Sequence, residues 1–230
     1  MHHIYSVYAY SAFLFLTIPL IIVLSVLPGL GLRRRLARRV GRMIFFIMGI
    51  KLNIRGLENL PDEPCIVIAN HASYLDGMIL FASLPPRFTF VIKREVTSVP
   101  FMHLLLRRVG SHFVERTNRA EAANHLKKML RRAQSGESLA IFPEGTFRVE
   151  PGLRNFQKGA FAVAHKTNMP MIPVFIHGAR KALPAEEWKL TRIPLFIEIQ
   201  APLHYPGKFE NVNVLKQHLQ EIFQAHVGNI

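Results

Sequence analysis

The chain has very little cysteine and comparatively few acidic residues. Cys65 is the single cysteine among 230 residues, which excludes an internal disulfide framework and any CxxC metal or redox motif. We expect Cys65 to fill a buried strand, and its solitary state suits the cytosol. Lys and Arg number 29 against 15 Asp and Glu, giving a formal charge of +14. Such an excess predicts an acidic partner, namely nucleic acid, anionic lipid or a phosphorylated substrate.

Internal repeats and low-complexity stretches are also missing, and half of the residues are apolar. A chain of this length can build one sizeable core and is short for two full domains. We therefore expect one globular domain with an appendage.

Residues 4–32 contain no charged side chain, although about 20 helical residues are enough to cross the roughly 30 Å of bilayer hydrocarbon. Basic residues follow at once, six of them arginines between positions 33 and 42. The positive-inside tendency then places the rest of the chain on the cytoplasmic side of the inner or cytoplasmic membrane. A cleaved signal peptide is the alternative, but its basic residues should precede the apolar run, where only His2 and His3 stand.

Residues 1–50 are thus predicted to be a membrane-anchoring helical segment. Pro19 should kink a spanning helix, and Pro28 with Gly29 should end it. A second apolar cluster at residues 43–50 follows the arginines, so residues 33–50 also fit an interfacial helix with its arginines at the lipid headgroups. Spanning the bilayer and lying on one leaflet both remain open.

From residue 51 to residue 230 short apolar runs alternate with longer mixed segments, which is typical of α/β domains. We expect a mixed, largely parallel sheet flanked by helices. The predicted strands are residues 65–69, 88–92, 111–114, 139–142, 171–176 and 195–199. Helices are predicted between them, at residues 74–84, 119–134 and 213–226, where apolar residues recur at three-to-four spacing.

The segment 70–76, NHASYLD, follows the first predicted strand and separates His71 from Asp76 by five positions. A carboxylate that accepts one imidazole N–H leaves the other ring nitrogen free as a base and stabilises the imidazolium that forms. A structural alternative exists, because Ser73 and Asp76 also form a variant of the capping box at a helix start. Both interpretations can hold together.

The segment 142–146, FPEGT, follows the fourth predicted strand, which Pro143 should end. A tight turn here would present backbone N–H groups to a phosphate or a hydroxyl. Arg148 and Arg154 flank the turn, and guanidinium groups suit phosphate because they donate two hydrogen bonds at once. An ordinary turn with surface arginines would look the same in isolation.

The two segments in this order resemble the glycerolipid acyltransferase family, which includes the 1-acylglycerol-3-phosphate (lysophosphatidate) acyltransferases. Two further blocks agree with it. Residues 113–116, FVER, resemble the acceptor-binding block, and residues 169–174, MPMIPV, resemble the proline-containing fourth block. The four blocks cover residues 70–174 in the order that the family shows.

The resemblance implies a single acyltransferase domain that carries an acyl chain from acyl-CoA or acyl-carrier protein to a lysophospholipid hydroxyl, most typically that of 1-acylglycerol-3-phosphate. His71 would be the general base and Asp76 would orient it. The resemblance and the neighbouring basic residues together imply a set of acceptor-binding residues: Lys93, Arg116, Glu144, Gly145, Thr146, Arg148 and Arg154. No metal or cofactor is required, because a thioester is already activated. Membrane lipids are the expected partners, and oligomeric state is not predicted.

One position departs from the family pattern. Phe147 stands directly after Glu-Gly-Thr, where the family usually has arginine, and Arg148 comes one residue later. Arg148, by a local shift, and Arg154, returning from the turn at Pro151 and Gly152, are both candidates for the missing phosphate contact. The change also leaves open an acceptor other than lysophosphatidate.

Proteins of other classes fit less well. A serine hydrolase would need a Gly-x-Ser-x-Gly elbow, which is missing from the sequence. A nucleic-acid-binding protein would explain the charge but not the long apolar amino terminus. A catalytically idle lipid-binding protein of the same fold is the third alternative, and the intact pair of His71 and Asp76 argues against it.

Overall fold

The computed structural model describes residues 2–94, 96, 101–114, 119–150, 152–204 and 209–227. Its centre is a seven-stranded sheet in the order β1-β7-β6-β2-β5-β3-β4. Neighbouring strands run parallel except for β6 and β7, which pair antiparallel, so the expected mixed, largely parallel sheet is confirmed. The strands are β1 (Leu52–Arg55), β2 (Ile66–Ala69), β3 (Phe88–Lys93), β4 (His112–Val114), β5 (Ser138–Ile141), β6 (Met171–His177) and β7 (Leu195–Ile199).

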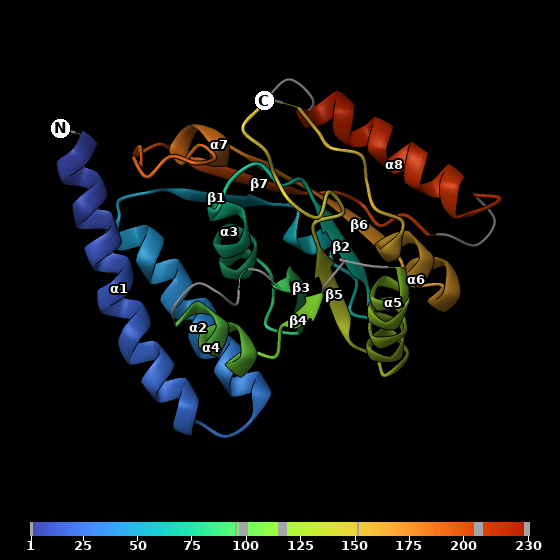
Figure 1. Cartoon of the computed structure of the whole chain (residues 1–230), viewed down its shortest axis with the longest axis horizontal. Coiled ribbons are helices and arrows are strands. Elements are labelled where there is room, and N and C mark those ends of the chain that lie inside the picture. The colour runs from blue at the N-terminus through green and yellow to red at the C-terminus, as the bar shows by residue number, and fades with distance from the viewer. Residues whose placement is uncertain are drawn as a thin grey trace.

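Helices cover both faces of this sheet (Figure 1). One face carries α1 (His2–Val26), α2 (Leu30–Ile47), α3 (Leu75–Ser83), α4 (Met102–Arg108) and α7 (Ala179–Ala182). The other carries α5 (Arg119–Gln134), α6 (Gly159–Thr167) and α8 (Val212–Val227). Strand β2 supplies both cores, because Val67 and Ala69 pack on the α3 side while Ile66 and Ile68 pack on the α6 side. Burial on both faces explains why this strand is a continuous apolar run.

The predicted strands and helices agree with the structure to within one residue at each end, and α5 and β7 have the predicted bounds. Strand β1, helix α4 and the 3-10 turn η1 (Leu57–Asn59) were not predicted from the sequence, and α6 and α7 were predicted without bounds. Strand β1 escapes notice because it is a short, half-buried edge strand whose partner, β7, lies about 140 residues away.

The amino-terminal pair consists of two helices joined at Gly29, whose φ of 78° suits glycine. Helix α1 continues through Pro19, and by length and composition it is able to cross a membrane. Only 28% of its most apolar window is buried in the protein, and Ile4, Phe15 and Val26 are among its most exposed side chains. The division into an anchor of residues 1–50 and a domain of residues 51–230 stays a prediction, but Ile44 and Phe45 of α2 belong to the main core.

Three arginines of α2 contact the domain, so they do not fit the expectation of an interfacial helix with its arginines at the lipid headgroups. Arg34 is 6% exposed and donates to the carbonyls of Arg87 and Val109 and to the hydroxyl of Thr89. Arg33 and Arg38 also donate to carbonyls of the domain. These hydrogen bonds hold α2 against the carboxyl ends of α3 and α4 and against β3. The exposed arginines are Arg35, Arg39 and Arg42.

Candidate active site

The two diagnostic segments lie at the same edge of the sheet. Strands β2 and β5 are parallel neighbours, with Ile68 in register with Ile141, so their carboxyl ends meet. Segment 70–76 leaves β2 and segment 142–146 leaves β5 at this edge. Ligands of open α/β sheets bind outside the carboxyl ends of the strands, which makes this edge the expected location of the site.

His71 and Asp76 form the hydrogen-bonded pair that the spacing predicts. The Nδ1 of His71 lies 2.9 Å from the Oδ2 of Asp76. A carboxylate only accepts, so Nδ1 donates this hydrogen bond, and in the neutral form of the ring Nε2 has the free lone pair. The Asp76 side chain is fully buried, whereas that of His71 is 18% exposed. The pair therefore has the arrangement of a general base with its orienting carboxylate.

Asp76 also fixes the start of α3, so the two interpretations of segment 70–76 hold at once. Its Oδ2 accepts the backbone N–H groups of Ala72, at 2.6 Å, and of Ser73, at 2.8 Å. Ser73 in turn donates through its hydroxyl to the carbonyl of Leu183. The helix start and the geometry of the His71–Asp76 pair therefore depend on the same carboxylate oxygen.

Glu144 is buried between the two segments rather than facing solvent. It is 4% exposed, and its carboxylate accepts the backbone N–H of His71 at 2.7 Å and that of Arg154 at 2.9 Å. Burial raises the pKa of Glu144, and the hydrogen bonds from Arg154 and His71 oppose that rise. The geometry makes Glu144 a link between the base and the segment that carries Arg154.

The turn at residues 142–145 closes on itself. The N–H of Gly145 donates to the carbonyl of Phe142 at 3.1 Å, and the φ of Gly145 is 78°. The N–H of Gly145 is therefore used inside the turn, while the expectation that turn amides meet a phosphate or a hydroxyl stays a prediction for the other N–H groups of the turn. The left-handed backbone explains why glycine stands here.

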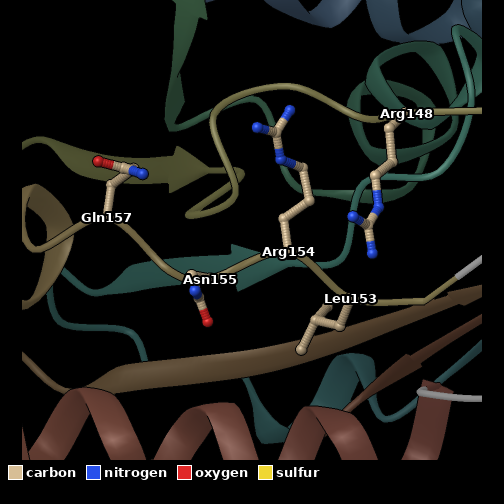
Figure 2. A pocket seen from close by; sticks show the side chains of 5 residues that line it. All are labelled: Arg148, Leu153, Arg154, Asn155 and Gln157. Carbon is tan, nitrogen blue, oxygen red and sulfur yellow. The ribbon is translucent and has the colours of Figure 1, made fainter. Parts of the chain in front are cut away.

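Arg148 and Arg154 line one cavity of about 300 Å³, together with Leu153, Asn155 and Gln157. Figure 2 shows the side chains of Arg148 and Arg154 running in opposite directions along this cavity, while Asn155 points away from the guanidinium of Arg154. Within the described part of the chain neither guanidinium has a carboxylate partner. Two cationic side chains that line one cavity favour a bound anion.

Among the residues that the structure describes, the other predicted acceptor-binding residues do not line this cavity. Lys93 ends β3 at the same edge of the sheet, and Thr146 is half-buried just after the turn. Arg116 lies outside the described residues, two positions after the end of β4.

Two residues that the sequence analysis did not assign support the site. The Asn70 side chain donates to the carbonyl of Ile176 and accepts its N–H, which ties the end of β2 to β6. Arg180 of α7 donates to the carbonyls of Arg148 and Val149. An asparagine at the end of a buried strand needs hydrogen-bond partners for both its amide oxygen and its amide nitrogen. This requirement is the feature of the sequence from which a structural role of Asn70 could have been predicted. The contact of Arg180 spans about 30 residues and has no local signal.

Comparisons with known proteins agree with this geometry. The sequence profile of the family described as Acyltransferase matches residues 51–177, more than half of the chain. The chain belongs to the acyltransferase family. The matched region contains both segments of the site and the β2-β5-β3 part of the sheet that positions them.

The chain is similar to proteins that are named as 1-acyl-sn-glycerol-3-phosphate acyltransferases. It is 30% identical over 190 residues to the 1-acyl-sn-glycerol-3-phosphate acyltransferase of Saccharomyces cerevisiae, covering 79% of this chain and 63% of the yeast protein. A chloroplastic 1-acyl-sn-glycerol-3-phosphate acyltransferase of Arabidopsis thaliana is 34% identical over 157 residues, covering 67% of this chain and 44% of its own. The chain thus spans less than two thirds of the length of either relative.

The fold of the acyltransferase also has a solved counterpart. The crystal structure of the 1-acyl-sn-glycerophosphate (LPA) acyltransferase of Thermotoga maritima superposes with a TM-score of 0.82 over 99% of this chain and 96% of that one, at 23% identity. The likeness extends over the amino-terminal helices as well as the sheet, and it shows the fold.

Proposed function

We propose that this acyltransferase transfers an acyl chain from acyl-CoA or acyl-carrier protein to the free hydroxyl of 1-acylglycerol-3-phosphate, giving phosphatidate. The observation that carries the proposal is the 2.9 Å pair of His71 and Asp76, which Glu144 links to a cavity that two arginines line. The names of the yeast and Arabidopsis relatives support the choice of acceptor.

The proposed step needs only the two substrates and the His71–Asp76 pair. Nε2 of His71 takes the proton of the acceptor hydroxyl while that oxygen attacks the thioester carbonyl. The tetrahedral intermediate then collapses, the C–S bond breaks, and the imidazolium returns the proton to the leaving thiolate. Asp76 stabilises the positive ring between these events. The products are the new ester and a free thiol, with no metal or cofactor and no acyl-enzyme.

The acceptor phosphate is proposed to bind between Arg148 and Arg154. Both side chains line the same cavity, so the choice between them that the sequence left open becomes a shared role. Glu144 connects this cavity to the base, because its carboxylate bonds the backbone N–H groups of both Arg154 and His71. A phosphate held there would place a nearby hydroxyl of the same molecule at the base.

The amino-terminal helices are proposed to keep the enzyme at the surface where its amphipathic acceptor resides. Helix α1 exposes apolar side chains, and α2 exposes Arg35, Arg39 and Arg42. Apolar insertion combined with basic residues at anionic headgroups is how interfacial helices bind. The arginines would place the catalytic domain on the cytoplasmic side.

The proposal is tested by measuring thiol release from acyl-CoA in mixed micelles with 1-acylglycerol-3-phosphate. His71→Ala should lower kcat by roughly a thousandfold, because general-base catalysis is worth about 10² to 10⁴. His218→Ala, which changes an exposed histidine of α8, should keep full activity. A wild-type protein that releases no thiol with either donor and any lysophospholipid would contradict the proposed function. Equal activity of wild type and His71→Ala would contradict the mechanism.

The phosphate site is tested by Arg148→Ala and Arg154→Ala, each assayed with phosphorylated and neutral acceptors. A hydrogen bond to a charged group contributes about 1.5 to 3 kcal/mol, so each change should raise KM for 1-acylglycerol-3-phosphate roughly tenfold or more. Use of monoacylglycerol should change little. Arg131→Ala, at the far end of α5, is the matched control. Equal losses on both kinds of acceptor would reject the phosphate role.

A further inference from the structure

Four aromatic rings form a continuous row through the proposed base. The ring of His71 stacks on that of Phe142, with centroids 4.2 Å apart and planes inclined by 17°. Phe147 contacts His71 from another direction, with centroids 4.7 Å apart and planes inclined by 71°. Tyr74 meets Phe147 in turn at 4.7 Å and 90°. The row begins in the partly buried wall of the site and ends at Tyr74, which is 63% exposed.

The contacts on His71 restrict its ring unequally. Asp76 fixes the Nδ1 atom, but a single hydrogen bond still lets the imidazole pivot about it. The stacked Phe142 bounds one ring face. Phe147 supplies the second ring contact, in a T-shaped arrangement, and it is itself half-buried. The direction in which Nε2 points therefore depends on Phe147.

We infer that Phe147 is a positioning residue for the proposed reaction. Its ring holds the imidazole of His71 so that Nε2 faces the acceptor hydroxyl, and Tyr74 packs against Phe147 and supports it. The inference rests on the proposed function. Phe147 occupies the place where the resembled family has a cationic residue, while Arg148 and Arg154 line the neighbouring cavity. In this chain an aromatic ring beside the base has taken that place, and the cations lie one and seven positions later.

The first test separates kcat from KM. Phe147→Ala should lower kcat roughly tenfold to a hundredfold, because a small misplacement of a catalytic group costs that much. KM for the acyl donor and for 1-acylglycerol-3-phosphate should stay within about twofold, a loss confined to catalysis rather than binding. Phe147→Tyr keeps the ring and should restore most of kcat. Val149→Ala, which shortens a 52% exposed side chain two residues on, is the control.

The rival role for this position is phosphate binding, and Phe147→Arg distinguishes the two. If the position serves phosphate, the new guanidinium should lower KM for 1-acylglycerol-3-phosphate and keep kcat. Under our inference kcat falls about as far as in Phe147→Ala, because the ring contact with His71 is lost. A gain in affinity with kcat intact would overturn the inference.

The bracing role of Tyr74 predicts coupling between the two substitutions. Tyr74→Ala alone should reduce kcat less than Phe147→Ala does, because it acts through the Phe147 ring. In the Phe147→Ala background the same change should have almost no further effect, the non-additivity expected of residues in contact. Losses that simply multiply would show that Tyr74 acts independently.

A second readout does not depend on turnover. Diethyl pyrocarbonate acylates exposed imidazole nitrogens, and peptide mass spectrometry follows its rate at His71 alone. The rate should rise severalfold in Phe147→Ala and stay at the wild-type value in Phe147→Tyr and Val149→Ala. An unchanged rate together with normal kcat in Phe147→Ala would overturn the inference even if the wild-type enzyme acylates lysophosphatidate. No acyl transfer by the wild type, with a raised rate in Phe147→Ala, would overturn the proposed function alone.

Discussion

Main-chain groups hold the residues of this site at least as firmly as side chains do. The Oδ2 of Asp76 accepts two backbone N–H groups besides the imidazole, and Glu144 accepts two more. A carboxylate that accepts several N–H groups stays in place without a cationic partner. The same four contacts shape the backbone of segment 70–76 and join it to Arg154.

Glu144 offers a prediction at this scale that separates a positioning role from substrate binding. In Glu144→Gln the amide NH₂ would face one backbone N–H, which leaves a buried donor unpaired at a cost of about 1 to 3 kcal/mol. For a chain of this size that corresponds to a fall in Tm of roughly 2 to 12 °C. Activity should fall with it, because His71 and Arg154 both lose a fixed neighbour.

The matched control is Glu150→Gln, an exposed carboxylate in the same loop. Thermal unfolding of the two variants in the same detergent measures the difference, and the control should melt with the wild type. A Glu144→Gln protein with wild-type Tm and a raised KM for the acceptor would instead support direct acceptor binding by Glu144.

At the scale of elements, His112 makes the packing of β4 against α5 sensitive to pH. The side chain is 7% exposed, and burial lowers its pKa to about 4, with the positive charges of Arg132 and Lys128 and the ring of His125 acting in the same direction. Glu137 opposes them. His112 is therefore neutral in the folded protein at neutral pH.

The sign of the effect follows from proton binding. Between about pH 6.5 and 4 the unfolded chain holds a proton at this residue and the folded chain does not, so stability falls as pH falls through that window. At 1.36 kcal/mol per pH unit the full loss is roughly 3 kcal/mol. His112→Leu should flatten the slope of unfolding free energy against pH, measured by denaturant titration at several pH values. His218→Leu, which changes an exposed side chain of α8, should keep the wild-type slope.

The sequence predicts elements well where local pattern and burial coincide. Strand β2 is apolar at every position because both of its faces are covered, and α5 carries its apolar residues at helical spacing, so both were found. Strand β1 and the inward-facing Arg34 were not, because each is defined by partners far away in the chain, such as Leu195 and Val109. Such long-range contacts cannot be predicted from the local sequence pattern.

The candidate site divides in the same way. The pairing of His71 with Asp76 follows from spacing at a strand end and was predicted. The burial of Glu144 and the contact of Phe147 with the base depend on how the ends of β2 and β5 meet, so the motif alone did not reveal them. Residue types and the local His71–Asp76 pair were predictable, whereas contacts between residues of different segments were not.

At the scale of the whole molecule, some arginines of α2 form hydrogen bonds inside the protein and others face outward. Arg33, Arg34 and Arg38 are used internally, which leaves Arg35, Arg39 and Arg42 on the outside of α2, beside exposed Met43 and Phe46. Helix α1, which packs against α2, adds its own exposed apolar residues. We expect this surface, rather than the net charge of +14, to determine membrane binding.

Removing residues 1–50 would test this poorly, because Ile44 and Phe45 belong to the core and the fold would be damaged. Replacing Arg35, Arg39 and Arg42 together by glutamine is a cleaner change. Each surface cation near an anionic leaflet contributes about 1 kcal/mol, so affinity for phosphatidylserine-containing vesicles should fall roughly a hundredfold, and less at high salt. Binding to neutral vesicles, which depends on α1, should be unaffected.

The control removes the same charge from another face, by changing the exposed Lys127, Lys128 and Arg131 of α5 to glutamine. Vesicle co-sedimentation compares the two triple variants with the wild type at equal ionic strength. If α2 faces the headgroups, only its variant loses affinity for anionic vesicles, because screening confines the attraction to charges within about 10 Å of the surface. Equal losses in the two variants would mean that the protein is attracted by its total charge, and the proposed orientation on the membrane would fail.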